Sequence, residues 1–251
     1  VNAETFMHES PKRNFLKPLL RFRSMIIFSL LLSLFCTDEV AAQKHTHGGH
    51  DLGVVRFPVS CSPQAQSAFN YAVALLHHMT YPQARQAFQD VEKIDSRCAM
   101  AYWGEAMTLF QPLWPTRPGP AALEQGWAAV QKAKALQPPT ERERLFIAAG
   151  EAFFLDPTSK DYWLRIRRWE EAMQKVYAAF PDDPEAGAFY ALAHLATTPS
   201  DRITRDHADR AAEILVAIYK KNPNHPGAMH YLVHANDVPG RERELMEITR
   251  K

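Results

Sequence analysis

The sequence predicts an all-α protein built from repeated pairs of helices. Alanine is abundant, β-branched residues are sparse, and no stretch alternates apolar and polar residues as a half-buried strand would. Similar helix ends recur at Asp95, Gln137, Phe180 and Asn222, and they lie 42, 43 and 42 residues apart. A fixed period of this length is typical of a helical solenoid, in which consecutive helix pairs stack side by side.

The size and charge of the chain narrow the functions to consider. Its 251 residues, 46% of them hydrophobic, are enough to bury a continuous core. The formal net charge is +1, and basic residues are interspersed with acidic ones rather than collected in blocks. Because nucleic-acid-binding proteins attract phosphates with a concentrated basic surface, we expect no nucleic-acid partner.

Residues 1–42 have the pattern of a secretory signal peptide. Basic residues precede the apolar run 25–36, and the small residues Ala41 and Ala42 follow it. The run has 12 residues, whereas a membrane-spanning helix needs roughly 20. We therefore expect cleavage after Ala42, a periplasmic or secreted location, and no membrane span in the mature chain. An uncleaved membrane anchor is the alternative.

Residues 43–62 are expected to form a flexible segment that contains histidine, and residues 63–251 the helical repeat domain. The first helices of four pairs can be aligned by their start residues, which are Pro63, Thr140, Pro184 and Pro226. An alanine stands nine positions after each start. A small residue there lets the partner helix approach closely, as stacked helix pairs require.

Several stretches resemble the tetratricopeptide repeat, among them Ala84-x-x-x-Phe88 in a second helix. The stretches 52–63, 98–104, 189–192 and 225–235 are similar to an uncharacterised group of exported bacterial tetratricopeptide proteins. The resemblance implies a right-handed α-α superhelix, here of about five helix pairs with the last one incomplete. Members of that group usually continue through more pairs, and this chain departs from them after Asp237. The resemblance therefore implies that the C-terminal part is missing.

Repeat solenoids usually bind a partner along the concave face, which the first helix of each pair lines. The residues predicted to point to that face are strongly apolar and aromatic, and a large exposed apolar surface usually marks a binding site. The leading hypothesis is therefore a scaffold without a cofactor that binds a protein or peptide there. Alternatively, a tight superhelix or the missing repeats fill the groove. The predicted groove residues are Phe69, Val73, Leu76, His77, Met100, Trp103, Met107, Phe110, Phe146, Phe153, Phe154, Tyr190, His194, Met229 and Leu232.

Histidines support a second hypothesis, a metal-binding protein or metal-dependent enzyme that uses zinc or copper. His225, His230 and His234 lie in one short segment, and the last two are four residues apart on one helix face. Such a pair can hold one Zn²⁺, with Asp237 as a further ligand or an orienting group. The alternative is that His234 is a buried, hydrogen-bonded histidine, because the repeat alignment gives it a packing position.

A second group of histidines, His45, His47 and His50, lies near the expected mature terminus. Cleavage after Ala42 would expose the amine of Gln43. That amine, two backbone amides and the imidazole of His45 form a square-planar set suited to Cu²⁺ or Ni²⁺. The alternative is a flexible linker that happens to contain histidine.

Cleavage would leave two cysteines, Cys61 before the first helix and Cys98 at the start of the third. The starts of successive first helices lie side by side in a solenoid, so we expect one disulfide in an oxidising compartment. Two free buried thiols are the alternative. The sequence has no Ser/His/Asp signature, glycine-rich phosphate loop or paired-cysteine motif, so no enzyme class is predicted.

Overall fold

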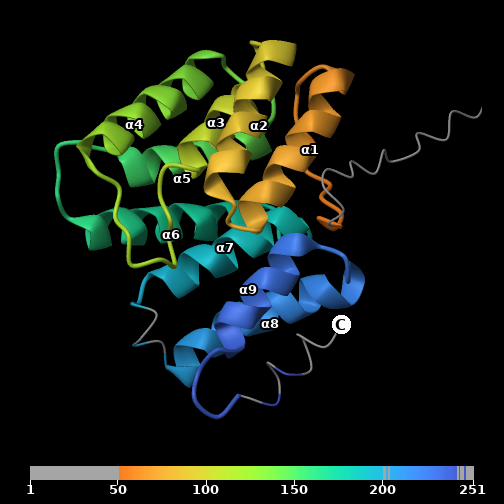
Figure 1. The fold of residues 1–251 in the computed structure, drawn as a ribbon, viewed down its shortest axis with the longest axis vertical. Coiled ribbons are helices and arrows are strands. Elements are labelled where there is room, and N and C mark those ends of the chain that lie inside the picture. The colour runs from red at the N-terminus through yellow and green to blue at the C-terminus, as the bar shows by residue number, and fades with distance from the viewer. Residues whose placement is uncertain (1–50, 200–201, 203, 242, 244–245, 247–251) are drawn as a thin grey trace, which may run out of the picture. The chain divides into compact units, whose positions relative to one another are not determined.

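The structure is a computed structural model that describes residues 51–199, 202, 204–241, 243 and 246. The expected signal peptide and the histidines at positions 45, 47 and 50 lie outside the described residues. Within them the structure contains nine α-helices and no strand, which confirms the all-α prediction (Figure 1). The helices are α1 (Pro63–His77), α2 (Tyr81–Ile94), α3 (Ala99–Met107), α4 (Pro120–Ala135), α5 (Glu141–Phe154), α6 (Tyr162–Ala179), α7 (Pro184–Ala196), α8 (Arg205–Lys221) and α9 (Pro226–Asn236).

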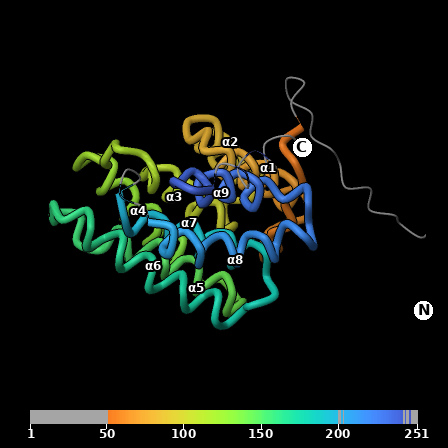
Figure 2. Tube along the Cα trace, turned by 90° about the horizontal axis from the view of Figure 1, so that it is seen from below, coloured from red at the N-terminus to blue at the C-terminus, as the bar shows by residue number. Residues whose placement is uncertain are grey.

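Helix packing follows chain order. Every helix contacts the next one along the chain, and α1 contacts α3, α3 contacts α5 and α7 contacts α9. The first and last helices, α1 and α9, also contact each other. The succession can be followed in Figures 1 and 2. Contact between α1 and α9 brings residues from opposite ends of the described chain into one neighbourhood.

Helix starts follow local sequence signals. Ser62, Thr140 and Asp183 each accept a hydrogen bond from a backbone N–H in the first turn of α1, α5 and α7. Proline opens α1, α7 and α9, where no bond within the helix needs its missing N–H. These four helices therefore begin where the sequence alignment predicts, with Thr140 as the cap of α5 rather than its first residue.

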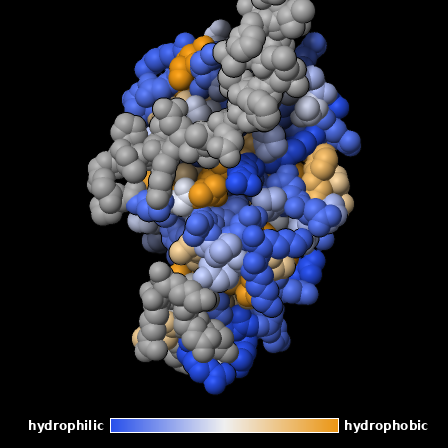
Figure 3. All heavy atoms as spheres, turned by 90° about the vertical axis from the view of Figure 1, so that its right-hand side faces the viewer, coloured by the Kyte–Doolittle hydropathy of each residue, from blue (hydrophilic) through white to orange (hydrophobic). Residues whose placement is uncertain are grey.

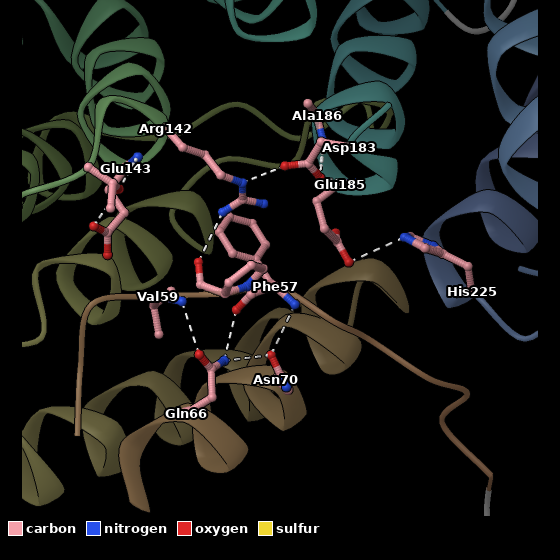
Figure 4. Close-up of polar contacts among 12 residues, drawn as sticks. Phe57, Val59, Gln66, Asn70, Arg142, Glu143, Asp183, Glu185, Ala186 and His225 are labelled. Carbon is pink, nitrogen blue, oxygen red and sulfur yellow. Dashed lines mark hydrogen bonds and ion pairs between the residues drawn. The ribbon is translucent and has the colours of Figure 1, made fainter. Parts of the chain in front are cut away.

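The segment before α1 packs against the helices. Residues 51–62, expected to belong to a flexible segment, are held by backbone hydrogen bonds to side chains of α1. Gln66 donates to the carbonyl of Phe57, and Asn70 accepts from the N–H of Phe57 at 3.2 Å. The ring of Phe57, labelled in Figure 4, is fully buried. It lies 4.9 Å from the ring of Phe146 and 5.6 Å from that of Trp103. Its apolar contacts and satisfied backbone explain why this segment is ordered.

Cys61 and Cys98 form a disulfide, which confirms the predicted pairing. The backbone N–H of Ser62 also donates to Asp95 at 2.8 Å, so the bridge and this hydrogen bond together join the start of α1 to the start of α3. A disulfide is compatible with an oxidising compartment outside the cytoplasm. No helix in the described ranges is long and apolar enough to cross a membrane.

Candidate functional site

The residues predicted to line an open groove lie mainly in the core. In the described structure they do not form an exposed apolar surface, and only His194 and Met229 are half-buried rather than buried. The face drawn in Figure 3 is mostly hydrophilic outside the grey atoms, with small separate hydrophobic areas. The buried members are Phe69, Val73, Leu76, His77, Met100, Trp103, Met107, Phe110, Phe146, Phe153, Phe154, Tyr190 and Leu232.

Two features of the fold fill the space where the groove was expected. Phe57 inserts between the rings of Phe69, Trp103 and Phe146, which come from α1, α3 and α5. At the other end of this aromatic row, α9 packs against α1 and α7. In the described structure these aromatic side chains therefore pack in the interior instead of lining an open face.

A cluster of polar side chains lies inside this core, where α1, α7 and α9 meet. It consists of His77 at the end of α1, Glu185 at the start of α7, and His225 and Tyr231 from α9. His77 Nε2 lies 2.8 Å from Glu185 Oε2, and His77 Nδ1 lies 3.0 Å from the Tyr231 hydroxyl. His225 Nε2 lies 3.2 Å from Glu185 Oε1, and Figure 4 shows the carboxylate directed at this ring. We call these four residues the inner cluster.

The hydrogen bonds of the inner cluster determine where its protons lie. The backbone N–H of Ala228 donates to Nδ1 of His225, which caps α9, so a neutral His225 carries its hydrogen on Nε2. That nitrogen lies close to Glu185 Oε1, but the angle at the hydrogen does not meet hydrogen-bond geometry. His225 Nε2 and Glu185 Oε1 are therefore both without a hydrogen-bond partner. If the Tyr231 hydroxyl donates to His77 Nδ1, then His77 Nε2–H donates to Glu185. Both imidazoles then face a carboxylate that only accepts.

Electrostatics favour this assignment. Burial alone would raise the pKa of Glu185, but the two neighbouring histidines outweigh burial and hold that pKa well below its usual value. Glu185 also occupies the first turn of α7, where the helix dipole stabilises a negative charge. Burial lowers the pKa of His77 and raises that of Tyr231. The inner cluster therefore holds one buried carboxylate beside the neutral imidazole of His77.

The inner cluster has the spacing of a metal site, but the ring hydrogen of His225 lies on the nitrogen that would bind the ion. One ligand atom from each of His77, Glu185 and His225 lies within 4.8 Å of the other two. A metal on His225 Nε2 would require the ring hydrogen to move to Nδ1, and that nitrogen already accepts from Ala228. The residues therefore fit a metal poorly, and the cluster is better explained as a polar connection between three helices.

A second pair of histidines, His230 and His234 of α9, lies beside the inner cluster and nearer the surface. His230 Nδ1 is 2.7 Å from the backbone carbonyl of His77. A carbonyl can only accept, so Nδ1 of His230 carries the hydrogen and its Nε2 has a free lone pair. That Nε2 lies 3.2 Å from Nε2 of His234. We call His230 and His234 the outer pair.

Both rings of the outer pair are neutral near pH 7. Burial lowers the pKa of His230, and burial followed by repulsion from His230 lowers the pKa of His234 to about 4. Neutral imidazole is the form that binds metal ions. Without a metal, Nε2–H of His234 donates to Nε2 of His230, and a bound cation would take the place of that shared hydrogen.

The predicted metal ligands are thus divided between two places. His230 and His234 converge as expected, but His225 points to Glu185 instead of joining them. Asp237 is exposed and acts on His234 electrostatically, in the direction that raises its pKa. Sequence reasoning missed Glu185 because it reads as an ordinary first-turn acid, and its contact with His77 spans 108 residues.

A third group of polar residues lies between α6, α7 and α8. The rings of His194 and His207 stack with centroids 4.4 Å apart, and His194 lies 3.4 Å from Glu170. Burial, then the neighbouring His194, lowers the pKa of His207. The two rings lie face to face with an interplanar angle of 25°, whereas in the outer pair the two Nε2 atoms lie 3.2 Å apart.

Comparison with known proteins adds no identification. The sequence matches no known protein family, and no curated protein matches it.

Proposed function

We propose that the chain is an exported helical-repeat scaffold whose outer pair, His230 and His234, binds a divalent transition-metal ion. One observation carries the proposal. The backbone carbonyl of His77 fixes the hydrogen of His230 on Nδ1, so the lone pair of Nε2 points toward His234. A hydrogen bond of this kind on the nitrogen that does not bind the metal is the usual arrangement for metal-ligating histidines.

The distance between the two nitrogens favours a tetrahedral ion. For a metal about 2.0–2.1 Å from each nitrogen, a separation of 3.2 Å corresponds to an N–metal–N angle of about 100–106°. Tetrahedral coordination requires about 109°, which is the preferred geometry of Zn²⁺ with nitrogen ligands. The two rings supply two of the four ligands, and the half-buried position of the pair leaves access for others.

The scaffold and its location are also proposals. Contacts between alternate helices, together with the period of the sequence, support a right-handed superhelix of tetratricopeptide-like pairs. The disulfide supports the periplasm or the exterior of the cell. A protein or peptide partner would have to use a surface other than the predicted groove, because those side chains pack in the core.

Metal titration tests the proposal. The full chain is titrated with Zn²⁺ by calorimetry, alongside the variants His230→Ala and His234→Ala. His207→Ala, a half-buried histidine of α8, is the matched control. We expect each outer-pair variant to bind Zn²⁺ at least about tenfold more weakly, as loss of a ligand implies, and the control to bind like the wild type. Equal binding by all variants with intact helical circular dichroism would overturn the proposal, as would a wild-type chain that binds no zinc.

A further inference from the structure

We propose that metal binding at the outer pair is coupled to the docking of α9 against α1, so that each stabilises the other. This inference rests on the proposed function and concerns the regulation of the same site. α1 and α9 are the first and last helices that the structure describes, and they contact each other. Both metal ligands, His230 and His234, lie on α9, but the group that orients His230 lies on α1.

The orienting group is the carbonyl of His77, the last residue of α1. The last four carbonyls of a helix have no partner within it. In α1 the carbonyls of residues 74–76 accept from backbone N–H groups of residues 78–80, which follow the helix. The fourth carbonyl, that of His77, accepts from Nδ1–H of His230 at 2.7 Å. A side chain of α9 therefore completes the hydrogen bonding at the end of α1.

A bound metal ion strengthens this hydrogen bond between the two helices. A cation on Nε2 withdraws electrons from the imidazole of His230, so that Nδ1–H becomes a stronger donor. The acceptor lies at the C-terminal end of α1, which carries a partial negative charge. Hydrogen bonds with an ionised partner are roughly twice as strong as neutral ones. Metal therefore favours the docked position of α9, and docking favours metal binding by the same factor.

The inner cluster holds His77 in the position that this contact requires. The hydroxyl of Tyr231, the residue after His230, lies 3.0 Å from Nδ1 of His77. Glu185 of α7 lies 2.8 Å from Nε2 of the same ring. Because the ring has a hydrogen-bond partner on each nitrogen, His77 cannot turn without losing one of them. His77 and Tyr231 are therefore positioning residues of the outer pair.

The close approach of α9 to α1 depends on Gly227, in the first turn of α9. A Cβ there would stand 2.5 Å from Nδ1 and 2.7 Å from Cε1 of His77. The His77 ring is fully buried and hydrogen-bonded, so it cannot move aside without losing a partner. Alanine at position 227 would therefore displace α9 from the end of α1 and weaken the hydrogen bond to His230, while both metal ligands remain in the chain.

Variants that keep both metal ligands test the coupling. The affinity of the full chain for Zn²⁺ is measured by calorimetry for the wild type, Gly227→Ala and Tyr231→Phe. Gly126→Ala is the control for the first variant, because its Cβ would stand 2.0 Å from the ring of Phe154 and its helix, α4, packs on α3 and α5. Tyr190→Phe is the control for the second, because it also removes the hydroxyl of a buried tyrosine.

We expect Gly227→Ala to bind Zn²⁺ about tenfold more weakly, as loss of an outer hydrogen-bond partner of a metal ligand implies. Tyr231→Phe, which acts one step further from the ion, should bind it at least about twofold more weakly. Both controls should bind like the wild type. Hydrogen exchange of the wild type, with and without Zn²⁺, is the second measurement. Zinc should slow amide exchange at residues 74–80 at the end of α1 as well as in α9.

The outcomes separate this inference from the proposed function. If Gly227→Ala does not fold, Tyr231→Phe and hydrogen exchange decide the question. Unchanged affinity in the folded variants, an equal loss in the controls, or slowed exchange confined to α9 overturns the coupling and leaves the proposed function intact. A wild-type chain that binds no zinc overturns both.

Discussion

Replacing Glu185 by alanine should destabilise the fold. The change removes the carboxylate that faces Nε2 of both His77 and His225, and all three side chains are buried. Nε2 of His77 would then lose its hydrogen-bond acceptor, and His225 would lose the carboxylate oxygen 3.2 Å from its Nε2. Water cannot replace the carboxylate readily, because the surrounding helices α1, α7 and α9 close the space.

The magnitude follows from the cost of an unpaired buried group. A buried hydrogen bond to a charged group contributes about 1.5–3 kcal/mol. We therefore expect the free energy of unfolding to fall by about 1.5–3 kcal/mol, a substantial part of the total for an ordinary domain. With an m-value of about 2–3 kcal/mol/M, the urea midpoint falls by about 0.5–1.5 M.

Urea unfolding followed by circular dichroism measures the effect, with Glu141→Ala as the matched control. Glu141 also lies in the first turn of a helix, α5, but it is exposed. Its removal should cost only the helix-dipole contribution of about 0.3–1 kcal/mol. Glu185→Gln, which keeps the shape and one acceptor, should fall between the two. If Glu185→Ala shifts the midpoint no more than Glu141→Ala, the assigned protons of the inner cluster are wrong.

Three other predictions concern stability. Acid should destabilise the fold between about pH 6.5 and 4. The pKa of His234 is 6.5 in the unfolded chain and about 4 in the folded chain, so the unfolded chain binds a proton there first as the pH falls. Glu92 has the opposite effect on stability between pH 7 and 4.5, since burial raises its pKa to about 7, but it is a single, partly exposed group. Urea midpoints that rise on acidification would contradict the prediction. Gly104→Ala should cost about 1–3 kcal/mol, because its Cβ would stand 2.2 Å from the ring of Phe88. Gly119→Ala is the control, because its Cβ has nothing within 4 Å; it loses only the N-cap preference of glycine at α4, so its melting temperature should fall less than that of Gly104→Ala. Reducing the disulfide should lower the free energy of unfolding by about 3–4 kcal/mol, and identical urea curves with and without reductant would refute this.

Local signals account for the part of the fold that the sequence predicts well. Helix starts at Pro63, Pro184 and Pro226 are determined by proline and by the capping residue before it, all within one turn. The disulfide could be predicted from the export signal together with the order of helices, because the starts of α1 and α3 are neighbours when pairs stack. Both kinds of inference need only contacts between elements that are close in the chain.

The inner cluster could not be predicted in this way. His77 and Glu185 are 108 residues apart, and His77 and Tyr231 are 154 apart. A period of about 43 residues gives the order in which helix pairs stack. It does not give the curvature that decides whether α9 meets α1. The outer pair was partly predictable, because four-residue spacing within one helix is local, whereas the carbonyl of His77 that orients His230 is not.

The composition of α7 contains a signal against an open groove. A helix that lines an exposed concave face should keep one polar side, since part of its circumference contacts water. In α7 every residue from Glu185 to Ala193 is buried, and the residues between are alanine, glycine, leucine, phenylalanine and tyrosine. A helix that is apolar all round must be enclosed by neighbours on every side. The sequence of α7 therefore favours a filled interior, and with it the burial of the aromatic set. The polar groups enclosed with that core, the carboxylate of Glu185 and the imidazoles around it, then need one another as partners, which is why histidines from α1 and α9 gather where these helices meet.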